Sequence, residues 1–164
     1  MLKEKLTQDL KDALRSGDAE KRLVLGMVSS VIKNRELEKR SRLSKQGVAE
    51  EELPAKSELT DEEILEAIAS EAKKRKESIA SFQSAGRAEL AEKEQRELNI
   101  LTPYLPEQMS EEQVRAVVQE VVAHVQPQGP KDMGKVIGQV MARVKGKADG
   151  QVVSKMVQEA LAGR

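Results

Sequence analysis

The sequence contains no cysteine and a single histidine, His124. Without cysteine the chain can form no disulfide bond, no thiolate nucleophile and no zinc–thiolate centre. With one histidine it cannot form a histidine-rich metal site either. The composition therefore predicts a protein without a bound metal and without cysteine-based catalysis.

Aromatic residues are almost absent, since the chain has one Phe, one Tyr and no Trp. Stacking of single-stranded bases relies on several exposed aromatic side chains, so this mode of nucleic-acid binding is not expected. The 28 basic and 28 acidic residues cancel, which gives a formal net charge of zero. A polyanion would have to be bound by a local patch of positive charge, and DNA is not an expected partner.

Long apolar runs are also missing. No segment approaches the ~18 consecutive apolar residues of a membrane-spanning helix. The N-terminal stretch MLKEKLTQDLKDAL alternates leucine with charge, unlike a signal peptide. We therefore expect a soluble, cytoplasmic protein that does not contact membranes.

The apolar residues that are present recur at three- and four-residue steps, which predicts α-helices along nearly the whole chain. Gly17 is expected to end the first helix and Asp18 to cap the second. The apolar stripes of the first, second and fourth helices hold Leu6, Ala13, Leu14, Leu23, Val24, Met27, Val28, Leu90, Ala91 and Leu98. Residues 44–58 lack such periodicity and contain Gly and Pro, so they are predicted to form a mobile loop.

Two capping boxes mark further helix starts, Thr60 with Glu63 and Ser110 with Gln113. Between them the segment TPYLPEQMS interrupts the helical pattern with two prolines. The sequence predicts an all-α fold with an N-terminal domain of helical hairpins, residues 1–105, and a C-terminal three-helix domain, residues 106–164. The helices of the second domain are expected at about 111–125, 132–145 and 150–162, and no β-hairpin or βαβ signature appears.

The segment GKVIGQVMARVKGKADG, residues 134–150, has the apolar spacing of a helix but carries glycines in its interior. Each interior glycine costs a helix about 1 kcal/mol relative to alanine. At about 100° per residue, Gly134, Gly138 and Ala142 form a stripe of small residues beside the core face. The stripe indicates a tight contact between helices, or the close approach of a nucleic-acid backbone or partner surface, and the two interpretations are compatible.

Positive charge gathers around the same segment. From residue 131 onward the chain has seven basic and three acidic residues, although it is neutral as a whole. We expect contacts to an RNA backbone from Lys135, Arg143, Lys145 and Lys147, with Gly134, Gly138 and Gly146 permitting close approach.

These glycines do not fit a nucleotide-binding loop. A phosphate loop requires Gly-Lys followed by Ser or Thr, whereas Gly146 and Lys147 are followed by Ala148. The dinucleotide fingerprint requires a strand before the glycines, and none is predicted. We therefore expect no cofactor.

Other polar groups favour structural interpretations. The basic run from Lys73 to Lys76 points all around a helix axis, so a solvated face is expected, with an RNA or partner contact as the alternative. Ser29, Ser30 and Lys33 lie in an amphipathic helix without an oxyanion loop. His124 lies at a helix end, where it interacts with the helix dipole. The sequence predicts no catalytic residue.

Four segments resemble the YqeY-like family. They are VIKNRELEKR (31–40), LTDEEILEAIASEAKKRKESIASFQSAGR (59–87), ELNILTPYLPEQMSEEQV (97–114) and MGKVIGQVMARVKGKADGQVVSKMV (133–157). The same segments are similar to the C-terminal tail of the GatB subunit of the tRNA-dependent amidotransferase. The resemblance implies an all-helical fold with a larger N-terminal and a small three-helix C-terminal domain.

The resemblance also implies a function, because the GatB tail is implicated in holding tRNA while chemistry resides elsewhere in that enzyme. Family-level labels would name carbon–nitrogen ligase activity with glutamine as amido-N-donor. The chain lacks the ATP- and metal-binding cradle of that enzyme, so no catalytic residue carries over. A tRNA-binding module, acting with the amidotransferase or another tRNA enzyme, is the resulting hypothesis. The alternative is a helical protein–protein adaptor, and a self-sufficient amidotransferase is the weakest reading.

Overall fold

The computed structural model of the protein describes residues 1–162, and the chain divides into two compact units. The first unit is Met1–Tyr104 and the second begins at Leu105. Residues 1–162 contain α-helices, two short 3₁₀ helices and no strand, which confirms the predicted all-α fold class.

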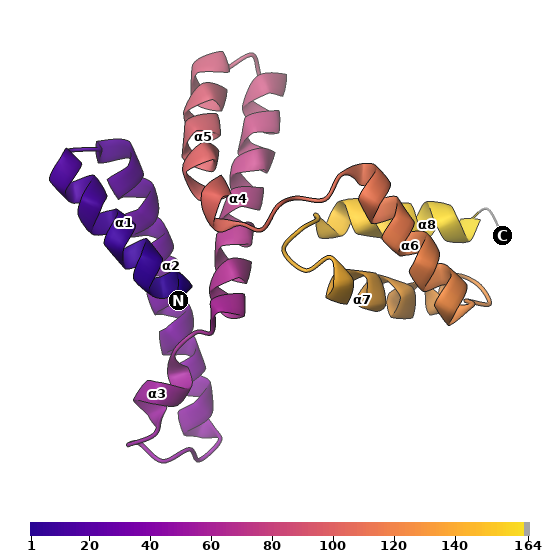
Figure 1. Cartoon of the computed structure of the whole chain (residues 1–164), viewed down its shortest axis with the longest axis horizontal. Helices are drawn as coiled ribbons and strands as arrows, with labels where there is room; N and C mark the ends of the chain where they lie inside the picture. Colours follow the sequence, from indigo (N-terminus) through magenta and orange to yellow (C-terminus); the bar gives the residue numbers. More distant parts are fainter. Residues whose placement is uncertain (163–164) are drawn as a thin grey trace. The chain divides into compact units, whose positions relative to one another are not determined.

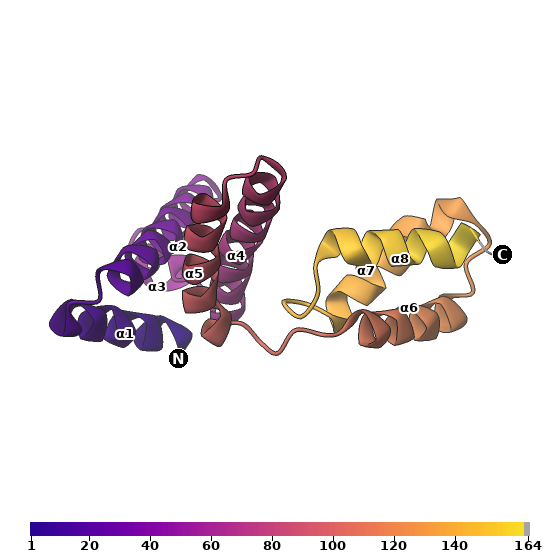
Figure 2. The ribbon, with the colours of Figure 1, turned by 90° about the horizontal axis from the view of Figure 1, so that it is seen from above.

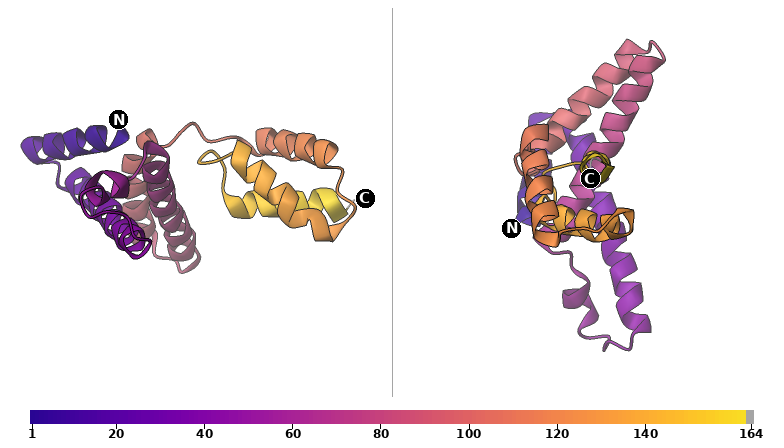
Figure 3. Two further views of the ribbon diagram at one scale, coloured as in Figure 1. Left: turned by 90° about the horizontal axis from the view of Figure 1, so that it is seen from below. Right: turned by 90° about the vertical axis from the view of Figure 1, so that its right-hand side faces the viewer.

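The first unit is built from helical hairpins (Figure 1). Its elements are α1 (Leu2–Ser16), α2 (Ala19–Lys45), α3 (Leu53–Ser57), α4 (Asp61–Ser84), α5 (Ala88–Leu101) and the 3₁₀ helix η1 (Thr102–Tyr104). Helix α1 packs against α2, and α4 packs against α5. The short α3 lies beside the C-terminal end of the long α2, as both views of Figure 3 show.

The local signals in the sequence set the helix ends as predicted. Gly17 ends α1 in the left-handed conformation, with φ of 74°. The side chain of Asp18 accepts a hydrogen bond from the amide of Lys21 at 2.9 Å and so caps α2. Thr60 and Glu63 form the reciprocal capping box at the start of α4, with N···O distances of 3.2 and 2.8 Å.

The prediction of an irregular loop at residues 44–58 was wrong in part. Helix α3 forms within it, and Leu53 packs into the core with 4% of its surface exposed. Pro54 lies in the first turn of α3, where its missing N–H costs nothing because that donor has no helical partner. A helix of five residues is too short to show a 3.6-residue period, so the sequence pattern could not reveal it.

Some predicted inward residues face solvent instead. Leu14 on α1, Leu23 and Met27 on α2, and Leu90 on α5 are exposed by 54, 53, 44 and 39%. The buried residues of α2 are Val24, Leu25, Val28 and Ile32. A helix buries only one sector of its surface, and these four exposed residues lie outside that sector.

A partly buried ion pair ties α1 to α2. The ammonium of Lys3 lies 2.6 Å from a carboxylate oxygen of Glu36, and the amide of Leu59 donates to the same oxygen at 3.3 Å. Burial opposes ionisation of Glu36, but the hydrogen bonds from Lys3 and Leu59 outweigh it, so the pKa of Glu36 is lowered. The hydrogen bond to Glu36 in turn raises the pKa of Lys3.

We predict that Glu36→Gln lowers the free energy of unfolding by about 1 kcal/mol at neutral pH, because Lys3 is half-exposed and the pair is partly screened by solvent. A lowered carboxyl pKa stabilises the fold above the ordinary Glu value of about 4.3, and this contribution is lost as the pH falls through the folded-state pKa. The raised pKa of Lys3 keeps the pair intact until strongly alkaline pH. Denaturant unfolding of wild type and variant at several pH values measures the difference.

The exposed neighbour Glu38 provides a matched control, since it lies on the same helix and no ion pair of Glu38 is found among residues 1–162. Glu38→Gln should leave stability nearly unchanged. A stability difference for Glu36→Gln that persists unchanged at pH 3 would contradict the assigned role of the carboxylate.

Tyr104 anchors the end of the first unit. Its side chain is buried, and its hydroxyl donates a hydrogen bond to Asp9 of α1. Burial and the hydrogen bond to Asp9 raise the pKa of the Tyr104 hydroxyl above its ordinary value. The ammonium of Lys5 lies 5.3 Å from the centre of the ring, within the range of a cation–π contact. The only tyrosine of the chain therefore fixes η1 to α1.

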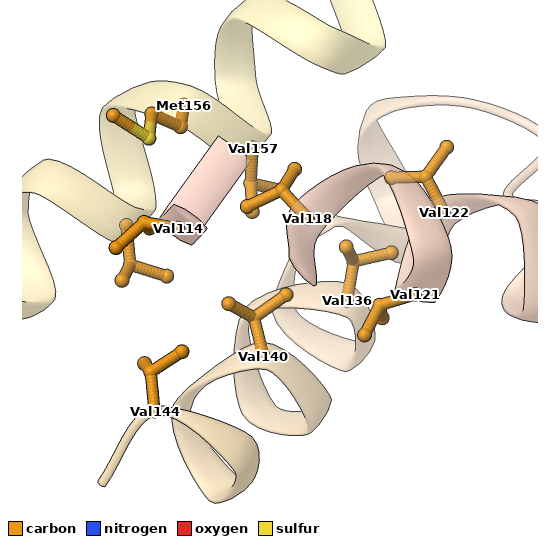
Figure 4. Close-up of a cluster of buried hydrophobic side chains, with 10 residues drawn as sticks. Val114, Val118, Val121, Val122, Val136, Val140, Val144, Met156 and Val157 are labelled. Atoms are coloured by element: carbon orange, nitrogen blue, oxygen red, sulfur yellow. The ribbon is translucent and has the colours of Figure 1, made fainter. Parts of the chain in front are cut away.

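The second unit is a three-helix arrangement (Figure 2). Its elements are α6 (Glu111–Val125), the 3₁₀ helix η2 (Pro130–Asp132), α7 (Met133–Arg143) and α8 (Gly150–Ala162). All three α-helices contact one another. Their shared core is dominated by valine, and Figure 4 shows Val118, Val140 and Val157 turned toward one another from the three helices.

The basic run at residues 73–76 holds one unexpected residue. Lys73 and Lys74 pair with Glu77 and Glu71 on their own helix, as expected for a solvated face. Arg75 is instead buried, with 7% of its surface exposed. The prediction that this run lies wholly on a solvated face was therefore wrong for Arg75.

Candidate nucleic-acid interface

Helix α7 presents its two interior glycines, Gly134 and Gly138, on an exposed face. Val136 and Val140 on the opposite side are fully buried, and Met133, Ile137 and Met141 pack partly against the same core. At about 100° per residue, this core face leaves Gly134, Gly138 and Ala142 outside. All three are exposed.

The space around the two interior glycines is empty. A Cβ placed on Gly134 or Gly138 would meet no heavy atom within 4 Å, apart from immediate chain neighbours and the backbone of the helix itself. A tight contact between helices would put neighbouring atoms at about 3.4–4 Å, so no contact within the described residues accounts for these glycines. Within the described residues, a tight contact between helices therefore does not explain the stripe.

The backbone conformation explains why a glycine stands at position 146. It follows the end of α7 with φ of 73°, a left-handed conformation that side chains disfavour. An added Cβ would lie 3.4 Å from Pro106, whose segment packs on this turn. The Gln108 side chain donates to the Gly146 carbonyl at 2.9 Å, and the Met109 amide donates to the Lys147 carbonyl at 2.8 Å. Gly146 therefore shapes the turn that follows α7.

The four candidate cations are distributed over two places. Lys135 is exposed and lies next to the glycine stripe on the helical wheel. Arg143 lies about 140° from Gly138 around the helix, and its guanidinium pairs with Glu120 of α6 at 3.2 Å. Lys145 and Lys147 are exposed on the turn between α7 and α8. The stripe is therefore bordered by Lys135 along its side and by the two lysines beyond its C-terminal end.

The other polar groups named in the sequence form ordinary helix contacts. The hydroxyls of Ser29 and Ser30 donate to the carbonyls of Leu25 and Gly26, four residues earlier, at 2.8 and 3.0 Å. His124 lies in the last turn of α6 and is exposed. Among residues 1–162 no group of three His, Cys, Asp or Glu side chains is arranged to hold a metal ion.

The second unit therefore presents an exposed helical stripe of small residues with lysines at its border. Comparison with known proteins places the whole chain. The sequence profile of a family described as YqeY-like protein matches residues 3–161. The chain belongs to the YqeY-like family. The family resemblance of the four segments is thereby confirmed, and it extends over nearly the entire chain.

One relative of this YqeY-like chain is altered inheritance of mitochondria protein 41, mitochondrial, from Pyrenophora tritici-repentis. The two are 32% identical over 113 residues, which cover 67% of this chain and 62% of the relative. The match thus spans less than two thirds of that protein's length. Within residues 1–162, none of the helices has the length and apolar character needed to cross a membrane.

Sequence reasoning missed one surface of this YqeY-like chain, on α2. Leu23 and Met27 were grouped with Val24 and Val28 in one apolar stripe, although residues adjacent in sequence lie about 100° apart on a helix. The sequence feature that could have indicated this surface is the width of the apolar sector of α2, which is larger than the sector that one helix buries.

Proposed function

We propose that this YqeY-like protein binds the backbone of RNA, in particular tRNA, through the exposed face of α7. The observation that carries the proposal is the open space over Gly134 and Gly138, next to the exposed Lys135. Catalysis is assigned to a partner, such as a tRNA-dependent amidotransferase or another tRNA enzyme. The proposed compartment is the cytoplasm.

The physical argument starts from the missing side chains. A helix without Cβ atoms along one stripe lets a sugar–phosphate chain come closer to the helix backbone than a helix with side chains would. Interior glycine costs stability, about 1 kcal/mol for each residue. No packing partner within the described chain offsets this cost at Gly134 and Gly138. A contact with an external molecule would explain why glycines stand at these positions despite the loss of helix stability.

The charges around the stripe suit a phosphate ligand. Lys135, Lys145 and Lys147 are exposed, and their positive charge attracts phosphates. Arg143 is paired with Glu120, but both side chains are about half exposed or more, and an ion pair so exposed contributes at most about 1 kcal/mol. Arg143 can therefore exchange its carboxylate for a phosphate at little cost.

Filter binding of total tRNA over a salt series tests the proposal. Each phosphate contact made by a lysine or arginine should add about 0.9 to the slope of log affinity against log salt. Three or four contacts should therefore cost between about 40-fold and 150-fold in affinity between 50 and 200 mM salt. Absence of binding at low salt would refute the proposal. In a pull-down from lysate, a protein that stays bound after ribonuclease treatment, together with no tRNA binding, would favour the adaptor alternative.

We predict that the double substitution Gly134→Ala and Gly138→Ala stabilises the second unit while weakening tRNA binding. Both glycines lie in a helix with free space for a methyl group, so each change should add about 0.5–1 kcal/mol to the free energy of unfolding. The same methyl groups would hold a sugar–phosphate chain away from the helix. Thermal unfolding and filter binding measure the two effects.

Gly146→Ala is the contrasting control. At φ of 73° an alanine is strained, so this change should destabilise the unit by about 1–2 kcal/mol. If the Gly134→Ala, Gly138→Ala variant binds tRNA as tightly as wild type, close approach at the stripe plays no part in binding.

A further inference from the structure

Helix α2 carries an apolar stripe that stays exposed, although Arg75 of α4 contacts the sulfur of Met27. Leu23, Met27 and Leu37 are exposed by 53, 44 and 53%. With Ser30 and Asn34 between them, they fall within a sector about 80° wide on the helical wheel. Solvent-facing leucines scattered singly are ordinary, but exposed apolar residues aligned along one helix indicate a binding face.

The N-terminal half of this stripe forms the floor of a groove of about 580 Å³. The groove is lined by Arg22, Leu23, Gly26, Met27, Ser30 and Val31 of α2 and by Glu71 of α4. Gly26 and Ser30 are small residues one turn apart, and a Cβ on Gly26 would meet nothing within 4 Å. A second helix could therefore approach α2 closely at this point.

One side of the stripe is closed by α4 and α5. Glu20 of α2 pairs with Arg96 of α5 at 3.1 Å. On α4, Glu71 is paired with Lys74 at 2.7 Å, so the carboxylate in the groove wall is already neutralised. An incoming helix would thus meet a wall without net charge on this side.

The other side of the stripe is open and basic. Arg22, Lys33 and Arg40 lie within about 20° of one another on the wheel and about 90° from the centre of the stripe. All three are exposed, and none has a carboxylate within 4 Å among residues 1–162. Their spacing from Arg22 to Arg40 covers about 27 Å of helix.

This distribution of charge opposes a second copy as the occupant. In a symmetric antiparallel pair of α2 helices each flank meets its own copy, so the three cations would face three like charges. In a parallel pair the cations would face the opposite flank of the other copy, which α5 already occupies through the Glu20–Arg96 pair. Bare RNA does not match the apolar floor of the groove.

We propose that the apolar stripe of α2, with Leu23 and Met27 in the groove and Leu37 beyond it as anchor positions, binds an amphipathic helix of a partner protein whose apolar face is bordered by acidic residues. The apolar face rests on the stripe, and the acidic edge faces Arg22, Lys33 and Arg40. A helix of about 18 residues spans these cations at 1.5 Å per residue. The groove lies entirely in the first unit and is independent of the RNA contact proposed for α7.

A designed peptide pair tests the proposal on the full-length protein. One 18-residue peptide carries leucines at helical spacing and glutamates along one edge, and its twin carries lysines at the glutamate positions. Fluorescence anisotropy should show the acidic peptide binding at least about tenfold more tightly, because three exposed charge pairs change sign. Leu23→Asp should weaken binding of the acidic peptide about 30-fold or more, since it places a charge on the groove floor.

Matched variants separate the groove from general surface effects. Leu14→Asp removes an equally exposed leucine outside the groove and should leave binding unchanged. Arg22→Glu with Lys33→Glu should reverse the preference between the twin peptides, whereas Lys11→Glu with Lys76→Glu should not. Equal binding of both peptides, or no effect of Leu23→Asp, would overturn the proposal. So would a wild-type dimer in sedimentation that Leu23→Asp converts to monomer.

Discussion

Replacing Arg75 with alanine should destabilise the first unit by about 3–5 kcal/mol, the usual cost of breaking a buried ion pair by removing one partner. Arg75 lies on α4 with 7% of its surface exposed, and its guanidinium is 2.9 Å from Glu97 of α5. Glu71 lies on the other side at 3.9 Å. Both carboxylates are as deeply buried as the arginine, so removal of Arg75 leaves negative charge in the core.

The contacts of Arg75 explain why the cost should be large. Glu97 would keep only Lys93, which is 4.0 Å away and exposed. Arg75 also donates to the sulfur of Met27, so three helices meet at its side chain. Its Nε has no hydrogen-bond partner among the described residues, although it is buried. Breaking the Arg75–Glu97 ion pair is therefore costly, even though the hydrogen-bonding capacity of Arg75 is not fully used.

Denaturant unfolding followed by tyrosine fluorescence measures this effect in the correct unit. Tyr104 is the only tyrosine, it lies in the first unit, and the chain has no Trp. Lys76→Ala in the same basic run is the control and should change stability by less than about 0.5 kcal/mol. A double variant, Arg75→Met with Glu97→Leu, should recover most of the loss because it removes both charges. A cost below about 1 kcal/mol for Arg75→Ala would contradict the buried position.

The basic run shows where sequence reasoning ends. Helix periodicity places Arg75 and its neighbours on different sides of α4, but it does not say which side another helix covers. The partner Glu97 lies 22 positions further along the chain on α5. Only the packing of α4 against α5 brings the two together, and a single sequence does not encode that distance directly.

Local signals were more informative than long-range ones. The boundaries of α1, α4 and α6 follow from a left-handed glycine and two capping boxes, which act through atoms three or four residues apart. Burial of individual side chains depends on distant elements. Leu90 was therefore placed inside although it is exposed, and Leu53 was placed in a loop although it is buried.

The glycines of the second unit show the same division. Sequence spacing grouped Gly134, Gly138 and Gly146 as residues that permit close approach. The backbone separates them, because Gly146 is left-handed and contacts Pro106, whereas the other two are helical and open. The helical pair is the part of the candidate site that spacing alone predicted and that no contact within residues 1–162 explains.

Reversing the two lysines beyond α7, Lys145→Glu with Lys147→Glu, should nearly abolish tRNA binding by the full-length protein. Each lost phosphate contact lowers the logarithmic salt slope by about 0.9, so the slope should fall by about 1.8. At 0.1 M salt, the loss of two such contacts alone should weaken tRNA binding about 60-fold, if 1 M salt is taken as the point at which the contacts no longer contribute. The added negative charges repel phosphate and should weaken binding further. Filter binding over a salt series measures both the affinity and the slope.

Three controls decide whether the loss reflects phosphate contact. Arg115→Glu with Lys155→Glu makes the same change in net charge on α6 and α8 and should reduce binding much less. Lys145→Arg with Lys147→Arg keeps both charges and should retain binding. Circular dichroism should be unchanged in every variant, because both lysines are exposed and the Lys147 carbonyl, not its side chain, accepts from Met109. Equal binding by the reversed and wild-type proteins would remove the α7–α8 turn from the interface and leave Lys135 as the cation beside the stripe.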